Sequence, residues 1–236
     1  MFKIRSKFYK KGDMVFISHL DLLRLFERAM RRAQIPIAYS QGFNPHPIMA
    51  FATALSIGIS SDAEYIDLTL YENMDEQVFK EKLNKVLPEG LKLVDSKEVP
   101  LKEASLMSIV KSSSYLVRFL IEDEINKNIF EEKLKDFENL DTIIIKKEKR
   151  KRKGNRWINN VQEVNIRESI KTIELANIDG KEVLVRMKLT AGEVGNIKPE
   201  IVVEELANHE NINYNKDSLR IHRINLLNEA EEDLMK

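Results

Sequence analysis

The sequence has 236 residues, 43% of them hydrophobic, which suits one large or two compact domains and excludes a disordered chain. Its 38 basic and 38 acidic residues balance, so a surface for nucleic acid must come from local clusters of charge. The chain lacks cysteine and long apolar runs, which excludes a disulfide framework, an iron–sulfur cluster of its own and a membrane-spanning helix.

The first half of the chain carries alternating strand and helix signals. Polar and apolar residues alternate from residue 2 to residue 9, which predicts a strand rather than a signal peptide and hence a cytoplasmic protein. Ser18 fits an N-cap, with Asp21 three residues later, for a helix that ends near Ala33. Further elements are expected as strands over residues 14–17, 35–39, 48–55, 64–71 and 91–99, and as a second helix over residues 75–87. The main elements follow the order β-α-β-β-α-β of a ferredoxin-like fold.

The second half repeats this plan after a segment of low periodicity. Residues 100–114 include five serines, which is typical of a linker. Strands are then predicted over 115–121, 142–146, 183–190 and 219–226, and helices over 124–137 and 199–207, whereas 163–175 fits a helix or a strand. The first of these helices would turn Ile125, Ile129, Leu134 and Phe137 inward. We therefore predict an α+β protein with two tandem ferredoxin-like (βαββαβ) domains, residues 1–100 and 115–236, joined by a linker at 101–114.

A stripe of arginines follows the first helix. Arg24, Arg28 and Arg31 have the spacing i, i+4, i+7, so they share one face beside the apolar residues. Guanidinium groups bind phosphate oxygens in pairs of hydrogen bonds, which suits a nucleic-acid backbone. The alternative is a solvated face on which Glu27 pairs with Arg31.

A second cluster of positive charge lies in the other half. The run KKEKRKRKGNR at residues 146–156 has eight basic residues and one acidic residue, and Trp157 follows it. Such a run predicts a surface for RNA or another polyanion, on which the tryptophan could stack a base. A solvated hairpin tip is the alternative. The expected RNA contacts are Lys149, Arg150, Lys151, Arg152, Lys153, Arg156 and Trp157.

The loop QGFNPHP at residues 41–47 is the most specific local pattern. Gly42 permits a positive φ, while Pro45 and Pro47 restrict the backbone on both sides of His46. We expect Gly42, Asn44 and His46 to contact RNA. His46 and His19 are also weak candidates for an acid–base pair, or for metal ligands with Asp21 or Glu64. Because a histidine in such a loop more often anchors the backbone, no catalysis and no metal site are predicted.

The most distinctive residues resemble one known family. They are FISHLDL at 16–22, the following ERAMRRAQIPIAYSQGFNPHP, and SDAEY at 61–65. Together they resemble the radical-SAM-linked protein family, a bacterial domain of unknown function that occurs fused to radical-SAM enzymes or as a separate chain. The resemblance spans nearly the whole chain and is weaker after Ser112. It implies a radical-SAM partner in a setting of RNA-related and ribosome-related genes.

These observations lead to one principal expectation and two alternatives. Radical-SAM enzymes hold their cluster with three cysteines, so a chain without cysteine is expected to be the accessory partner. The principal hypothesis is a non-catalytic protein, without cofactor or membrane contact, that binds tRNA or rRNA for a radical-SAM RNA-modifying enzyme. The first alternative is a metal-free endoribonuclease that uses His19 and His46. The second is a protein–protein scaffold that does not contact RNA.

Overall fold

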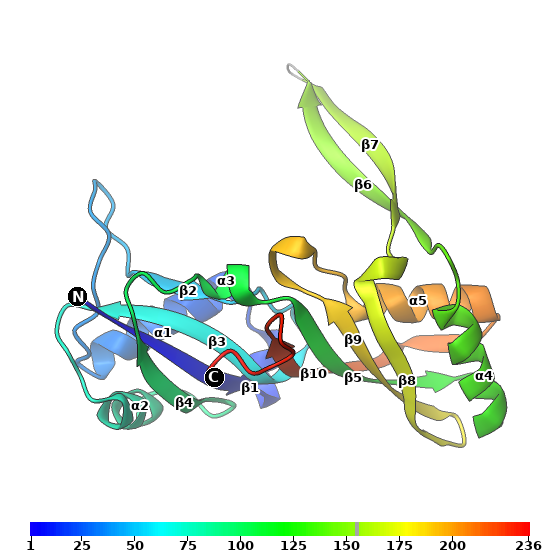
Figure 1. The fold of residues 1–236 in the computed structure, drawn as a ribbon, viewed down its shortest axis with the longest axis horizontal. Helices are drawn as coiled ribbons and strands as arrows, with labels where there is room; N and C mark the ends of the chain where they lie inside the picture. Colours follow the sequence, from blue (N-terminus) through cyan, green and yellow to red (C-terminus); the bar gives the residue numbers. More distant parts are fainter. Residues whose placement is uncertain (154–155) are drawn as a thin grey trace. The chain divides into compact units, whose positions relative to one another are not determined.

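The structure is a computed structural model that describes residues 1–153 and 156–236, and the side chains of these except 148–153, 156–160 and 194. The chain is of mixed α/β type and has two compact units. Unit 1 comprises residues 1–116, 191–195 and 220–236, and unit 2 comprises 117–190 and 196–219. Within the described residues, an eight-stranded mixed sheet has the order β4-β1-β3-β10-β5-β9-β8, and β2 pairs with β3 (Figure 1).

Unit 1 is built on antiparallel strands with a helix in each of two connections. The strand β1 lies between β3 and β4, and the short strand β2 pairs with β3 on its other side. The local order is therefore β4-β1-β3-β2. The elements are β1 (Phe2–Lys10), α1 (His19–Arg32), β2 (Met49–Phe51), β3 (Ser60–Leu70), α2 (Glu76–Asn84), β4 (Leu91–Val99) and α3 (Leu106–Ile109).

Helix α1 forms as its sequence predicts. The Ser18 hydroxyl accepts a hydrogen bond from the Asp21 N–H at 3.2 Å, which caps the first turn. Its buried face, Leu22, Phe26, Ala29 and Met30, packs into the core of unit 1. There the rings of Phe26 and Phe8 meet edge to face at 5.2 Å. The helix ends before Gln34, which adopts a left-handed φ of 53°.

Three segments of unit 1 differ from the sequence prediction. Residues 14–17 are not a strand, because most of them belong to a 3-10 turn at Gly12–Phe16. Residues 35–39 make only isolated bridges at Ile37 and Tyr39, since Pro36 has no N–H for a continuous ladder. The expected linker at 101–114 contains α3 and the start of β5, with Leu106 buried in the core.

Unit 2 has two helices and an additional strand pair. Its elements are β5 (Ser112–Ile121), α4 (Lys127–Glu138), β6 (Ile144–Lys153), β7 (Arg156–Asn165), β8 (Ile170–Asp179), β9 (Glu182–Thr190), α5 (Pro199–Glu210) and β10 (Tyr214–Leu227). The strands β5 and β10 contribute residues to both units. The pair β6–β7 forms a separate two-stranded ribbon (Figure 1). The ambiguous residues 163–175 turn out to end β7 and begin β8.

The inward face of α4 is a second correction. Ile129 is 50% exposed, whereas Phe130, Leu134 and Phe137 are buried. The Asn126 side chain caps the helix, which therefore starts later than predicted. The buried residues follow the spacing i, i+4, i+7, and Ile129 lies beside this stripe.

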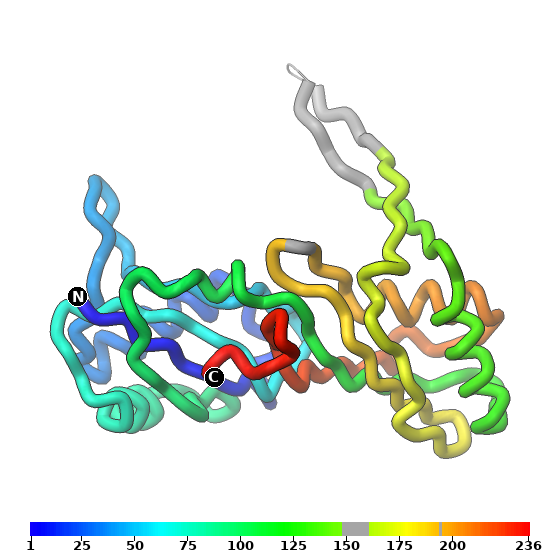
Figure 2. Tube along the Cα trace, viewed as in Figure 1, coloured from blue at the N-terminus to red at the C-terminus, as the bar shows by residue number. Residues whose placement is uncertain are grey.

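The segment that follows the last strand lies near the N-terminal strand of unit 1 (Figure 2). His222 and Arg223 of β10 pair in parallel with Ser60 and Ser61 of β3. After it, Asp233 binds the Lys7 ammonium group at 2.6 Å. In the described part of the chain, no helix combines the length and the apolar composition required to cross a membrane.

Candidate nucleic-acid interface

A groove of about 580 Å³ lies beside α1 in unit 1. Arginine side chains of α1 form its basic part, and apolar residues from α1 and from the turn after α2 form the rest. The lining residues are Leu25, Arg28, Arg31, Arg32, Val86 and Pro88. Three guanidinium groups therefore surround one concave surface that also has an apolar floor.

Intramolecular bonds hold these arginines in place. Arg28 donates from Nε to the Arg24 carbonyl at 3.2 Å, and Arg32 donates from Nη2 to the Val86 carbonyl at 2.7 Å. Arg31 pairs with Glu27 one turn before it, as the solvated-face alternative predicted. A guanidinium has five N–H donors, so these bonds leave further donors on each side chain. The remaining donors suit the oxygens of a phosphate.

Arg24 plays a different part from the rest of the stripe. It donates to the Asp21 carboxylate at 3.1 Å, and both side chains are more than half exposed. The Ser18 hydroxyl and then Arg24 lower the pKa of Asp21. The structure thus places Arg28 and Arg31 at the groove together with Arg32, which the sequence stripe did not include, and directs Arg24 to a carboxylate.

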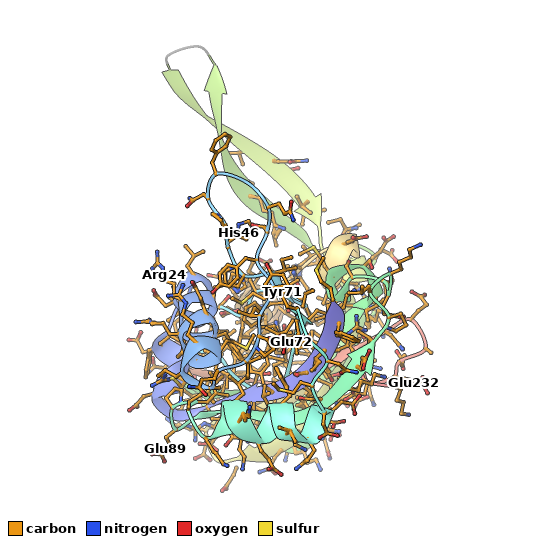
Figure 3. All side chains as sticks on the ribbon, turned by 90° about the vertical axis from the view of Figure 1, so that its left-hand side faces the viewer. Arg24, His46, Tyr71, Glu72, Glu89 and Glu232 are labelled. Atoms are coloured by element: carbon orange, nitrogen blue, oxygen red, sulfur yellow. The ribbon has the colours of Figure 1, made fainter. Side chains whose placement is uncertain are left out.

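The loop at residues 40–46 projects from unit 1 and is closed at its base (Figure 3). The Ser40 N–H donates to the His46 carbonyl at 2.9 Å, and the Ile48 N–H donates to the Ala38 carbonyl at 2.8 Å. The Ser40 hydroxyl also lies 2.9 Å from His46 Nδ1 and accepts from the His46 N–H at 3.1 Å. His46 therefore fixes the shape of its own loop.

The tip of this loop displays its side chains to solvent. Gly42 adopts a φ of +144°, which few other residues reach. Phe43 has a relative exposure of 111%, so its ring is uncovered on all sides. Phe43 was not among the sequence-predicted contacts, although its position between Gly42 and Asn44 in a proline-bounded loop was visible there.

The groove and the loop are connected through Tyr39. A hydrogen bond with the Tyr39 side chain, and next the nearby Glu27 carboxylate, raise the pKa of Arg31. The Tyr39 N–H donates to the Tyr71 hydroxyl at 3.3 Å, and Tyr71 lies below the loop (Figure 3). The arginine groove and the loop are therefore neighbouring parts of one surface.

The two candidate catalytic histidines have separate partners. The ring of His19 packs edge to face on Phe51 at 5.3 Å, while His46 binds Ser40. None of the hydrogen bonds or ring contacts found among the described residues joins His19 to His46. Nor does any group of three or more histidine, aspartate or glutamate side chains among these residues have the geometry of a metal site.

A histidine that the sequence pattern did not single out is part of a polar chain. His222 Nε2 lies 2.7 Å from Asp62, and its Nδ1 lies 2.8 Å from the Ser60 hydroxyl. Lys11 binds the other Asp62 oxygen at 2.6 Å. Burial raises the pKa of Asp62, but hydrogen bonds from Lys11 and His222 outweigh it and lower the value. Because Ser60 and His222 are register partners on adjacent strands, this chain joins β3 to β10.

Glu64, a possible carboxylate in the sequence analysis, is buried in an ion pair. Both of its oxygens accept from Arg223 Nη1, at 2.8 and 3.0 Å, and Arg223 Nη2 donates to the Tyr115 hydroxyl at 3.1 Å. Lys10 lies close by, and burial lowers its pKa against the opposing effect of Glu64. This cluster stabilises the interior of unit 1 and leaves no free carboxylate for catalysis at Glu64.

The basic run in the second half coincides with the ribbon β6–β7. Lys146 and Lys147 pair with Glu163 and Gln162 across it. The side chains of the predicted RNA contacts in this region lie outside the described part of the structure. They are Lys149, Arg150, Lys151, Arg152, Lys153, Arg156 and Trp157.

Comparisons with known proteins give one family and a general likeness of fold. The family described as "Uncharacterized protein conserved in bacteria (DUF2344)" matches residues 3–199. Curated proteins give no match. A chain in the structure of an H/ACA RNP bound to a substrate RNA containing 2′-deoxyuridine is 10% identical, with a TM-score of 0.52, and the match covers 95% of this chain and 47% of that chain.

A second solved structure gives a similar result. A chain in the crystal structure of the archaeal box H/ACA sRNP Nop10-Cbf5 complex is 11% identical, with a TM-score of 0.49 and coverage of 94% and 46%. The present chain therefore spans about half the length of the solved chains that it matches. At such low identity, the likeness concerns the fold alone.

Proposed function

Because the chain belongs to the bacterial family DUF2344, whose description assigns no activity, we propose a function from its own residues. The protein binds RNA, and the arginine groove of α1 together with the loop at residues 40–46 forms the contact surface. The observation that carries this proposal is the convergence of Arg28, Arg31 and Arg32 on one groove. Guanidinium groups held at a concave surface suit successive phosphates.

Charge and shape favour a nucleic acid over a small anion. The groove has an apolar floor of Leu25, Val86 and Pro88, and the loop adds aromatic and amide groups next to it. Bases and phosphates together use both kinds of surface, whereas a free phosphate uses only the arginines. The basic run at residues 146–156 is a separate region of positive charge that also suits RNA.

The fold is compatible with this proposal. One solved chain of similar fold belongs to an H/ACA RNP bound to RNA.

We also propose that each unit follows the ferredoxin-like pattern, supported by the order β4-β1-β3-β2 in unit 1 and β10-β5-β9-β8 in unit 2. The ribbon β6–β7 is then an insertion after α4. An experimental structure in which the ribbon joins the main sheet would contradict the ferredoxin-like pattern of unit 2.

The groove is tested by measuring RNA affinity against salt concentration for two variants. Arg28→Ala combined with Arg32→Ala removes two groove arginines and keeps the Arg31–Glu27 pair. We expect at least about tenfold weaker binding and a log–log salt slope reduced by about 1.4, since each single-strand phosphate contact contributes about 0.7. Arg24→Ala is the matched control, because it removes an exposed arginine of the same helix that does not line the groove.

The outcomes separate the three hypotheses. Equal affinity and slope for wild type and the double variant would remove the groove from the RNA site. Cleavage of the RNA by wild type, lost in His46→Ala, would favour the endoribonuclease alternative. Absence of RNA binding by wild type would favour the scaffold.

The role of accessory partner completes the proposal. Residues 1–236 contain no cysteine and hence no thiolate for an iron–sulfur cluster, so the cluster of a radical-SAM enzyme that uses this RNA would be held outside these residues. Anaerobic co-purification with and without ribonuclease treatment tests the association. A partner that stays bound after RNA digestion would indicate direct protein contact, and no recovered radical-SAM protein would contradict the partnership.

A further inference from the structure

We infer that Phe43 stacks on an RNA base, and that the RNA is single-stranded where it meets the loop at residues 40–46. This inference rests on the proposed RNA-binding function and adds to it the class of RNA and a specific contact. Phe43 has two unusual properties: its loop is closed by hydrogen bonds, and its ring is uncovered.

Hydrogen bonds within the loop at residues 40–46 fix the backbone that carries Phe43. Backbone bonds close the loop on both sides of Tyr39 and Pro47, which themselves form a bridge. Inside this closure, His46 Nδ1 lies 2.9 Å from the Ser40 hydroxyl and 3.4 Å from the Asn44 carbonyl. Pro45 and Pro47 further reduce the conformations open to the loop. Much of the entropic cost of presenting Phe43 is therefore met before any ligand binds.

The ring of Phe43 is displayed rather than packed. Its exposure of 111% means that no neighbouring side chain shields either face. Isolated apolar residues on a surface are common and need no function. Phe43 differs because a well-fixed loop carries it away from the core, where it gains nothing from burial within the protein. Both faces of the ring are available to a planar ligand.

The surroundings of Phe43 favour a base over an apolar protein pocket. Tyr39 and Tyr71 stand at the foot of the loop, and Tyr71 is 55% exposed. Tyr39 raises the pKa of the nearby Arg31, so a guanidinium group adjoins this aromatic surface. Aromatic rings next to arginines are the pattern of surfaces that bind single-stranded nucleic acid, where rings stack bases and cations bind phosphates.

The geometry also favours unpaired RNA. In a duplex the bases are already stacked on each other, and the deep major groove of A-form RNA is too narrow for side chains to read. A projecting phenylalanine can stack only on a base that is free to leave its neighbours. We therefore expect single strands, bulges or loops to be bound in preference to a continuous duplex.

The test compares single-stranded and duplex RNA of the same sequence on the full-length protein. Phe43→Ala should weaken single-strand binding by about 5- to 150-fold, the range that corresponds to the loss of one base stack. The salt slope should stay unchanged, because no phosphate contact is lost. Phe43→Trp should retain binding, and Gln41→Ala, another exposed residue of the same tip, is the matched control. A 2-aminopurine base in the RNA should be quenched by wild type but not by Phe43→Ala.

The results distinguish this inference from the proposed function. If Phe43→Ala binds like wild type while Arg28→Ala with Arg32→Ala binds weakly, the stacking role is overturned and RNA binding stands. If duplex binds as well as single-stranded RNA and Phe43→Ala weakens both equally, the single-strand assignment is overturned. If wild type binds neither RNA, both the inference and the function fail. Since Phe43 is fully exposed, a loss of folding in Phe43→Ala would itself contradict the description of the loop.

Discussion

The pair Glu64–Arg223 shows how single residues hold unit 1 together. The two side chains are 4% exposed each and lie on strands β3 and β10, at a sequence separation of 159. Arg223 also donates to Thr53 and Tyr115, while its Nε is buried with no hydrogen-bond partner among the described residues. A buried ion pair depends on both members, because the survivor of a broken pair keeps its desolvation cost.

We predict that either single substitution in this pair is severe. Glu64→Gln, which leaves the guanidinium buried without a counter-charge, should lower the free energy of unfolding by about 3–5 kcal/mol. Arg223→Met should cost a similar amount. The double variant Glu64→Gln with Arg223→Met should cost less than the sum, since neither member of the pair then carries a charge. Urea unfolding of the four proteins measures this cycle, and strictly additive losses would contradict the coupling.

The carboxylate of Asp233 makes the stability of unit 1 depend on pH. Burial raises its pKa, but bonds from Lys7, from the Met235 N–H and from Tyr65 together lower it. A lowered pKa means that the folded state favours the carboxylate. The stabilisation is therefore present above the ordinary aspartate value of about 3.9 and is lost as pH falls through the folded-state value.

The expected result is a pH-dependent effect of Asp233→Asn. This variant should be less stable than wild type at pH 7, and the difference should shrink as the pH falls below about 4. Thermal unfolding between neutral and acidic pH measures it. Asp123→Asn, at an exposed position in unit 2, controls for the general loss of a carboxylate. A constant difference at every pH would show that Asp233 is not bound as its carboxylate.

At the scale of elements, the edge strand β4 is protected by helix α2. The Asn84 side chain accepts from the Leu93 N–H at 2.8 Å and donates to the Leu93 carbonyl at 3.0 Å, as a neighbouring strand would. The Glu76 carboxylate accepts from the Glu98 N–H further along. An open strand edge invites pairing with other chains, so these side chains act against self-association.

We predict that Asn84→Ala with Glu76→Ala increases self-association through β4. The freed N–H and C=O groups gain partners when two edges meet, and light scattering or sedimentation should detect dimers or larger species at high protein concentration. Gln77→Ala is the control, since the Gln77 side chain bonds Glu81 of the same helix rather than the backbone of β4. A monomeric double variant would show that the strand edge is closed by other means.

At the scale of the whole molecule, unit 1 is assembled from distant parts of the chain. One of its core clusters combines Ala63 and Tyr65 of β3 with Leu106 of α3, and with Leu226 and Leu234 near the C-terminus. The domain boundary expected at residue 100 therefore cuts through residues that pack on each other. The C-terminal segment contributes both apolar contacts and the partner of Glu64.

A fragment of residues 1–114 should consequently fail to fold stably. It lacks Arg223, Leu226 and Leu234, and losses of about 2–5 kcal/mol for each together match the total stability of a typical domain, about 5–15 kcal/mol. Circular dichroism and urea unfolding measure this outcome. The full-length chain is the control, and a fragment with a cooperative transition of equal midpoint would contradict the contribution of residues 220–236.

Much of the secondary structure was predictable because its causes lie within a few residues. The Ser18 cap, the end of α1 near Ala33 and the strand Leu91–Val99 agree with the prediction, since capping and periodicity act locally. The prediction was wrong at residues 35–39, where Pro36, itself visible in the sequence, limits pairing to isolated bridges. It was also wrong at Ile129, where packing against the core buries Phe130 instead.

The same distinction applies to the candidate site. The arginines on one face of α1 and the restricted loop at residues 41–47 could be predicted from the sequence, because side-chain spacing and proline geometry are local properties. Three features became visible only in the folded chain: Arg28, Arg31 and Arg32 share a groove with Val86, Phe43 is uncovered, and Arg223 neutralises Glu64. These contacts depend on chain packing and on the parallel register of β3 with β10, which residue spacing along the sequence does not encode.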